Sequence, residues 1–134
     1  MKDCIFCKIV KGEIPSYKIY EDEHVFAFLD IACDTYGHTL VIPKKHCENV
    51  LDCDSDTLSH VLSAVQKISN HYVNKCGFSG VNILNASGKS AQQSVFHLHF
   101  HIIPRKDDDG VDAWPFKDKL TLDLAQMAEK LRLH

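Results

Sequence analysis

Short apolar runs bounded by turn residues predict five β-strands in this chain. The runs are rich in β-branched and aromatic residues, and Gly, Pro, Asp or Asn residues separate them. In the last run, apolar residues alternate with histidines, a period of two that is typical of a strand. Pro104 has no N–H group, so we expect it to end that strand. The predicted strands are 17–21, 25–29, 38–43, 81–85 and 94–104.

Apolar residues at three- and four-residue spacing predict a long helix from Ser55 or Asp56 to about Cys76, followed by Gly77. A shorter helix is expected over 119–133, with Leu120, Leu124, Met127 and Leu131 on one face. The segment before Val10 is also apolar and helix-compatible. The strands follow one another with one long helix inserted and without a regular βαβ alternation. This order favours an α+β fold with a five-stranded antiparallel sheet. We expect residues 1–134 to form a single domain.

Composition narrows the classes of partner. The 134 residues are 45% hydrophobic and 25% charged, as in ordinary globular proteins, and the net charge is −3. Without a basic excess, nucleic acid polymers and anionic membranes are not expected partners. No apolar run reaches transmembrane length and no signal peptide is apparent, so we expect a cytoplasmic protein. The six cysteines are then expected to be reduced thiols or metal ligands.

The alternation in the fifth run places His97, His99 and His101 on one face of the predicted strand. Leu98, Phe100 and Ile102 fall on the other face and can be buried. Histidine serves as acid, base, nucleophile and metal ligand, so three on one face indicate chemistry. Neighbours on that face are roughly 6–7 Å apart at the backbone. Zinc–nitrogen bonds are only about 2.0–2.1 Å, so we expect at least one of these histidines to remain free of metal.

The segment 97–103, His-φ-His-φ-His-φ-φ with φ apolar, resembles the signature of the histidine triad family. Further blocks are similar to that family in the same order, and the resemblance covers about residues 3–106, leaving a C-terminal tail and helix over 107–134. It is closest to the zinc-containing bacterial form of the nucleotide-binding branch. The resemblance implies a homodimer with a continuous sheet, a purine nucleotide site and cleavage of a bond at an α-phosphate. The additional blocks are 4–9, 12–15, 28–31, 37–46 and 93–96.

The resemblance also implies catalytic roles. His99 would attack the α-phosphorus through one ring nitrogen, giving a nucleotidyl-histidine that water hydrolyses to a nucleoside monophosphate. Its other nitrogen should then donate to a carbonyl, which fixes the tautomer. His38 and His101 would orient His99 and contact phosphate, and Ser94 would donate toward the leaving group. The expected substrates are nucleoside phosphoramidates or acyl-nucleotides; the alternatives are dinucleoside polyphosphates, a nucleotide-binding module with little catalysis, or a hydrolytic zinc site.

Nucleotide-binding positions follow from the same resemblance. Asn85, Gln93 and Ser94 would hold the phosphate together with His99 and His101. Asp30 matches the ribose position, where a carboxylate can accept from both hydroxyls, although an Asp in a loop can also serve only the turn. Six apolar residues would enclose the base, and each could equally be a core residue. They are Ile5, Phe6, Ile9, Phe28, Leu29 and Ile31.

A metal site is implied separately. Cys4 and Cys7 form a C-x-x-C pair, and with His46 and His97 they would make a Cys2His2 set suited to tetrahedral zinc. The separation of Cys7 from His46 is far longer than in a zinc finger, so only the resemblance joins them. Such a site would be structural and would leave His99 free. The alternative is a reduced C-x-x-C pair without metal.

Overall fold

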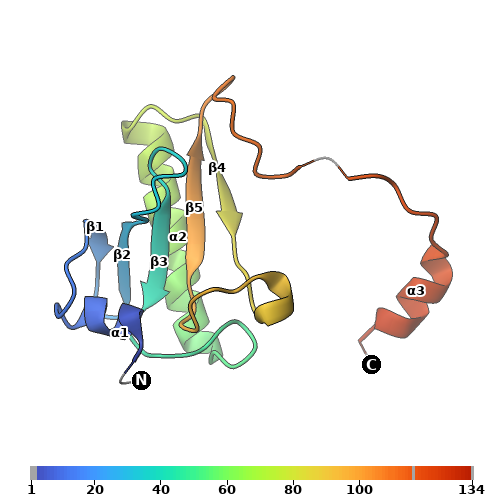
Figure 1. The fold of residues 1–134 in the computed structure, drawn as a ribbon, viewed down its shortest axis with the longest axis horizontal. Coiled ribbons are helices and arrows are strands. Elements are labelled where there is room, and N and C mark those ends of the chain that lie inside the picture. The colour runs from blue at the N-terminus through green and yellow to red at the C-terminus, as the bar shows by residue number, and fades with distance from the viewer. Residues whose placement is uncertain (1–2, 116, 134) are drawn as a thin grey trace.

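Five strands form one antiparallel sheet in the computed structural model, which describes residues 3–115 and 117–133. The strand order is β1-β2-β3-β5-β4, so β1 and β4 are the edges (Figure 1). The predicted α+β class and five-stranded antiparallel sheet are confirmed. The elements are α1 (Ile5–Val10), β1 (Lys18–Glu21), β2 (Val25–Leu29), β3 (Thr39–Pro43), α2 (Ser55–Lys75), β4 (Gly80–Leu84), the 3-10 turn η1 (Lys89–Ala91), β5 (Phe100–Arg105) and α3 (Leu124–Leu131).

The central strands are apolar on both faces because a helix covers each face. Val25, Ala27 and Val41 pack with α2 in one buried cluster. Phe28 and Leu40, from the alternate positions of the same strands, pack with α1 in a second cluster. This arrangement explains why β2 and β3 are nearly continuous apolar runs rather than alternating ones.

Helix α2 begins and ends close to where the sequence predicts. The side chain of Asp54 accepts a hydrogen bond from the backbone N–H of Thr57 and caps the first turn. After the last turn, Gly77 adopts φ +83, a left-handed conformation that glycine reaches without strain. Val61, Val65 and Ile68 lie on the buried face of α2. The 3.6-residue periodicity of the sequence therefore marks the face that packs on the sheet.

The predicted strand over 94–104 is only half correct. β5 begins at Phe100, and residues 95–97 form a bend instead. The ladder between β3 and β5 covers only Val41–Phe100 to Thr39–Ile102, although β3 itself continues to Pro43. Further toward the N-terminus, the N–H of Leu98 donates to the carbonyl of Cys47, in the loop that follows β3. The histidine segment therefore runs from loop into strand.

Pro104 does not end β5, which continues to Arg105. The carbonyl of Arg105 accepts from the N–H of Ser79 on the β4 side. Because peptide groups alternate along a strand, the nitrogen of Pro104 faces the β3 side, where the ladder has already stopped at Ile102. Its missing donor therefore costs no ladder hydrogen bond.

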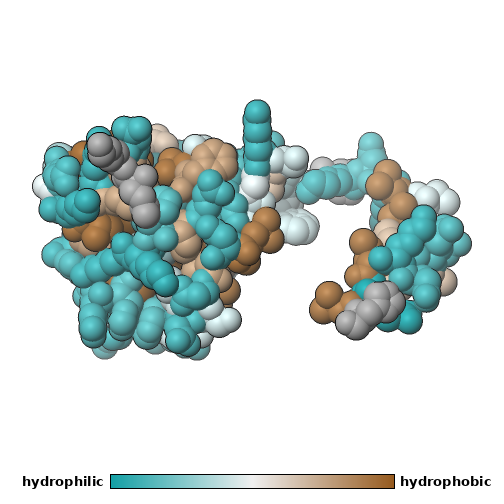
Figure 2. Space-filling view, turned by 90° about the horizontal axis from the view of Figure 1, so that it is seen from below, coloured by the Kyte–Doolittle hydropathy of each residue, from teal (hydrophilic) through white to brown (hydrophobic). Residues whose placement is uncertain are grey.

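The C-terminal helix is shorter than predicted. α3 covers Leu124–Leu131 rather than 119–133, because the side chain of Asp123 caps it by accepting from the N–H of Gln126. Leu120 therefore lies in the extended segment before the helix. This segment carries α3 away from the sheet (Figure 1), and Figure 2 shows apolar residues at the surface of this part of the chain. Among the described residues, no helix combines the length and apolarity needed to cross a membrane.

Candidate functional site

His99 lies immediately before β5 and is held as a neutral imidazole with one free nitrogen. Its side chain is almost fully buried, with 5% exposure, and its Nδ1 lies 2.8 Å from the carbonyl oxygen of His97. A carbonyl can only accept, so Nδ1 carries the proton and Nε2 keeps its lone pair. Burial lowers the pKa of His99, which keeps the ring neutral near pH 7. The ring is thus prepared to act as a nucleophile through Nε2.

Two further contacts fix the position of His99. The ring of Phe6 packs edge-on against the imidazole, with centroids 5.2 Å apart and planes at 88°. The amide Nδ2 of Asn85 donates to the carbonyl oxygen of His99 over 3.0 Å. The side chain that the resemblance assigns to phosphate binding therefore supports the backbone of His99 in this structure.

His38 and His101 form a second pair beside His99. Nε2 of His38 lies 2.8 Å from Nδ1 of His101, and the ring centroids of His99 and His101 are 5.0 Å apart. Nδ1 of His38 lies 2.7 Å from Oδ1 of Asp34 and 3.7 Å from Oδ2 of Asp30. Asp34 was missed by the sequence reasoning, because an aspartate in a polar loop has no pattern that points to a partner. The structure thus connects Asp30 and Asp34, through His38, to His101.

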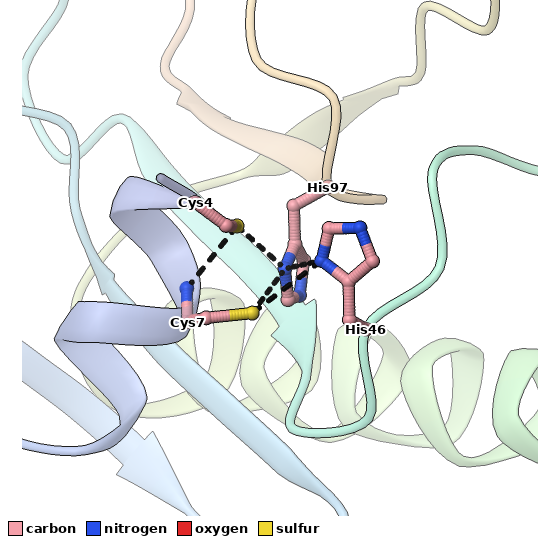
Figure 3. A group of neighbouring side chains, drawn as sticks. All are labelled: Cys4, Cys7, His46 and His97. Carbon is pink, nitrogen blue, oxygen red and sulfur yellow. Dashed lines mark hydrogen bonds between the residues drawn. The ribbon is translucent and has the colours of Figure 1, made fainter. Parts of the chain in front are cut away.

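A second cluster joins two sulfurs, from the N-cap and the first turn of α1, with two imidazoles from distant segments (Figure 3). His97 is fully buried, and its Nε2 lies 2.8 Å from the carbonyl oxygen of Pro43. Nε2 therefore donates, and Nδ1 directs a lone pair into the cluster. Burial lowers the pKa of His97 to about 4, so this lone pair is free at neutral pH. The predicted set Cys4, Cys7, His46 and His97 is assembled in one place.

The spacing of the four ligand atoms fits one tetrahedral ion. Corners occupied by sulfur at about 2.3 Å and nitrogen at about 2.0 Å from zinc lie roughly 3.3–3.8 Å apart. Nδ1 of His97 lies 3.3 Å from Sγ of Cys4, 3.5 Å from Sγ of Cys7 and 3.2 Å from Nδ1 of His46. Sγ of Cys7 lies 3.4 Å from Nδ1 of His46. Hydrogen bonds alone would not require all four atoms to converge in this way.

The remaining candidate residues differ in burial, and their roles in nucleotide binding stay predictions. Gln93 is buried, and its amide makes four hydrogen bonds, to Gly88, Asn49, Glu48 and Val95, so its side chain organises the loop. Ser94 is exposed. Among the apolar candidates, three are buried in the cluster beneath α1 and three are partly or fully exposed. The buried ones are Phe6, Ile9 and Phe28, and the others are Ile5, Leu29 and Ile31.

Known proteins resemble this chain over most of its length. The HIT domain family matches residues 11–108. Adenosine 5'-monophosphoramidase HNT1 of Candida albicans is 40% identical over 136 residues, covering 96% of this chain and 89% of that protein. A HIT family member from Bacillus subtilis is 47% identical in its crystal structure, with 98% of each chain covered and a TM-score of 0.83. A Zn-bound histidine triad family protein from Mycobacterium smegmatis is 38% identical, covers 87% of this chain and 85% of its own, and has a TM-score of 0.79.

Proposed function

The chain belongs to the histidine triad (HIT) family, and from that premise we propose that it is a hydrolase acting at the α-phosphate of a purine nucleotide conjugate. The substrates would be nucleoside phosphoramidates or acyl-nucleotides, and the product a nucleoside monophosphate. One observation carries the proposal: the carbonyl of His97 holds the proton on Nδ1 of His99, which leaves Nε2 unprotonated. The relative that is named a monophosphoramidase supports this class of substrate.

In the proposed reaction, Nε2 of His99 forms a bond to the α-phosphorus as the bond to the leaving group breaks. The imidazole then carries a positive charge, and its Nδ1–H continues to donate to the carbonyl of His97, a hydrogen bond that strengthens as the charge develops. Water next cleaves the nitrogen–phosphorus bond, which releases the nucleoside monophosphate and restores neutral His99. Ser94 would donate toward the leaving group, and His38 and His101 would contact the phosphate.

We also propose that Cys4, Cys7, His46 and His97 bind a structural Zn²⁺ ion. The support is the tetrahedral spacing of their ligand atoms and the Zn-bound family member from Mycobacterium smegmatis. All four positions of such a site are protein ligands, as is usual for structural zinc. The ion would join α1 to the histidine segment and take no part in bond cleavage.

The same proposal includes a homodimer in which β4 pairs with β4 of a second copy. β4 is an edge of the sheet and carries the exposed apolar side chain of Ile83. The molar mass in solution, measured by light scattering, tests this part. A mass of twice 15.2 kDa is expected, and a monomer at micromolar concentration would refute it.

The experiment that tests the activity is hydrolysis of adenosine 5'-phosphoramidate by the wild type and by His99→Asn. We expect AMP release by the wild type, with loss of turnover but retention of nucleotide binding in the variant. A diadenosine polyphosphate is assayed alongside, and faster turnover of that substrate would place the chain among dinucleoside polyphosphate hydrolases. Binding without turnover of either substrate by folded wild-type protein would identify a binding module instead.

A further inference from the structure

Asp34 is joined to the proposed catalytic site by a chain of two short contacts. Its Oδ1 lies 2.7 Å from Nδ1 of His38, and Nε2 of His38 lies 2.8 Å from Nδ1 of His101. The other charged or titratable groups that face His38 are Asp30, at 3.7 Å from its Nδ1, and His99, which lies beyond His101. The proposed reaction uses both histidines but gives no role to Asp34.

The chemistry of these three groups fixes where their protons lie. A carboxylate only accepts, and the hydrogen bond with His38 holds the pKa of Asp34 below its usual range, so Nδ1 of His38 carries a proton. The contact between His38 and His101 then contains a single proton shared by two ring nitrogens. In the neutral pair this proton belongs to Nδ1 of His101, because Nε2 of His38 has only a lone pair to offer.

One additional proton changes what Nε2 of His101 presents to the site, from a lone pair to an N–H. When the pair takes up this proton, Nε2 of His38 becomes N–H and donates to Nδ1 of His101. Nε2 of His101 then also becomes N–H. The positive charge then rests on His38, between the carboxylates of Asp34 and Asp30. His101 is a poor place for that charge because burial lowers its pKa to about 4. His101 remains neutral but presents a donor on the side of the ring that points away from His38.

We propose that Asp34 is a positioning residue that holds the extra proton of the pair on His38, so that His101 donates an N–H to the substrate phosphate. This inference rests on the proposed function for the identity of the substrate. The contacts among Asp34, His38 and His101 are present whether or not the protein turns over that substrate. Asp34 acts through His38 and does not itself reach the reacting atoms.

The test is the pH dependence of AMP release from adenosine 5'-phosphoramidate. Because the pair must hold a proton, the turnover number falls as the pH rises and that proton is lost. In Asp34→Asn we expect this fall at a pH lower by about one unit, which gives about tenfold lower turnover on the alkaline side and a small change on the acidic side. Asp34→Glu should restore most of the wild-type profile.

Glu23→Gln is the matched control. Glu23 is an exposed carboxylate 3.8 Å from the imidazole of His24, in the turn at the opposite end of β2, so its removal deletes the same charge beside an exposed histidine. We expect an unchanged profile. If Asp34→Asn lowers turnover equally at every pH, or leaves the profile unchanged, the inference is wrong.

A second measurement separates this inference from the proposed function. Nitrogen-15 NMR of labelled protein reports which ring nitrogen of His38 is protonated and at which pH the second proton is taken up. In Asp34→Asn we expect uptake at a pH about one unit lower than in the wild type, with Nδ1 no longer uniformly protonated. An NMR shift in a protein that hydrolyses no nucleotide conjugate would sustain the role of Asp34 and refute the activity. An unshifted signal would refute the role of Asp34 whatever the activity.

Discussion

Helix α1 has too little apolar burial to remain folded on the sheet by itself. It contains six residues, of which Phe6 and Ile9 are buried, with exposures of 6% and 8%. Burying these two side chains contributes roughly 3–6 kcal/mol. Fixing six residues of backbone costs roughly 6–12 kcal/mol, and an isolated helix of this length is not stable in water. A metal bound by Cys4 and Cys7 would supply the difference, because it ties the helix to His46 and His97.

We therefore predict that removing zinc releases α1 while the rest of the sheet stays folded. The cluster between the sheet and α2, which includes Val61 and Ile68, has no member in α1. Chelation, or Cys7→Ser, should let the amides of Ile5–Val10 exchange with solvent at close to the unfolded rate. The amides of α2 should keep their protection. Hydrogen exchange followed by mass spectrometry, with metal content measured in the same samples, checks both statements.

Cys76→Ser is the control for this experiment. Cys76 is exposed and lies outside the four-residue cluster, so its variant should keep both zinc and the protection of α1. Protection of α1 that survives verified loss of metal would refute the free-energy comparison above. Wild-type protein that contains no zinc after gentle purification would refute the metal site itself.

Two further predictions concern stability. Thr39 Oγ1 donates to the carbonyl of Gly37, so the hydroxyl of Tyr72, 2.6 Å away, must donate to Thr39. Tyr72→Phe should therefore lower the free energy of unfolding, measured with urea, by about 1 kcal/mol. An unchanged free energy of unfolding would show that this hydrogen bond contributes nothing to stability. His101 has a folded pKa of about 4, below the ordinary 6.5, so the unfolded chain binds more protons between these values and stability falls as the pH drops from about 6.5 to 4. After allowance for partial exposure, His101 accounts for about 1–2 kcal/mol of that loss, and His101→Asn should flatten the pH dependence of unfolding by this amount.

Local patterns predicted the elements well where one physical cause dominated. The apolar run Val25–Leu29 is predicted with its observed bounds, because five residues between turn signals are too few for a helix and suit a buried strand. The segment around His97 was assigned to a strand because its alternation is real in the sequence. Its conformation, however, depends on a contact between distant segments: the ladder with β3 stops at Phe100, and the N–H of Leu98 donates to the carbonyl of Cys47 instead. The overlong prediction for α3 has a local cause instead, because the side chain of Asp123 caps the helix and starts it at Leu124.

The candidate site divides along a similar line. The histidines and the pair Cys4 and Cys7 could be selected from the sequence because their spacing and residue type are unusual. Gln93 was selected as a phosphate ligand, yet its amide is occupied by four partners within the chain, and no sequence pattern reveals such use. Asp34 was not selected at all. Its importance depends on a 2.7 Å contact that only the fold of its loop creates.

His97 links the two halves of the site through one residue. Its carbonyl accepts from Nδ1 of His99 and fixes the nucleophile, while its ring is clamped between the carbonyl of Pro43 and the metal-ligand cluster. The ring of Phe6 lies in α1 between the N-cap Cys4 and Cys7, and it packs against both His97 and His99. A structural ion at this position would therefore orient the nucleophile without touching substrate. On this reasoning the loss of metal lowers activity in step with the release of α1, whereas a catalytic ion would stop the chemistry while α1 stayed in place.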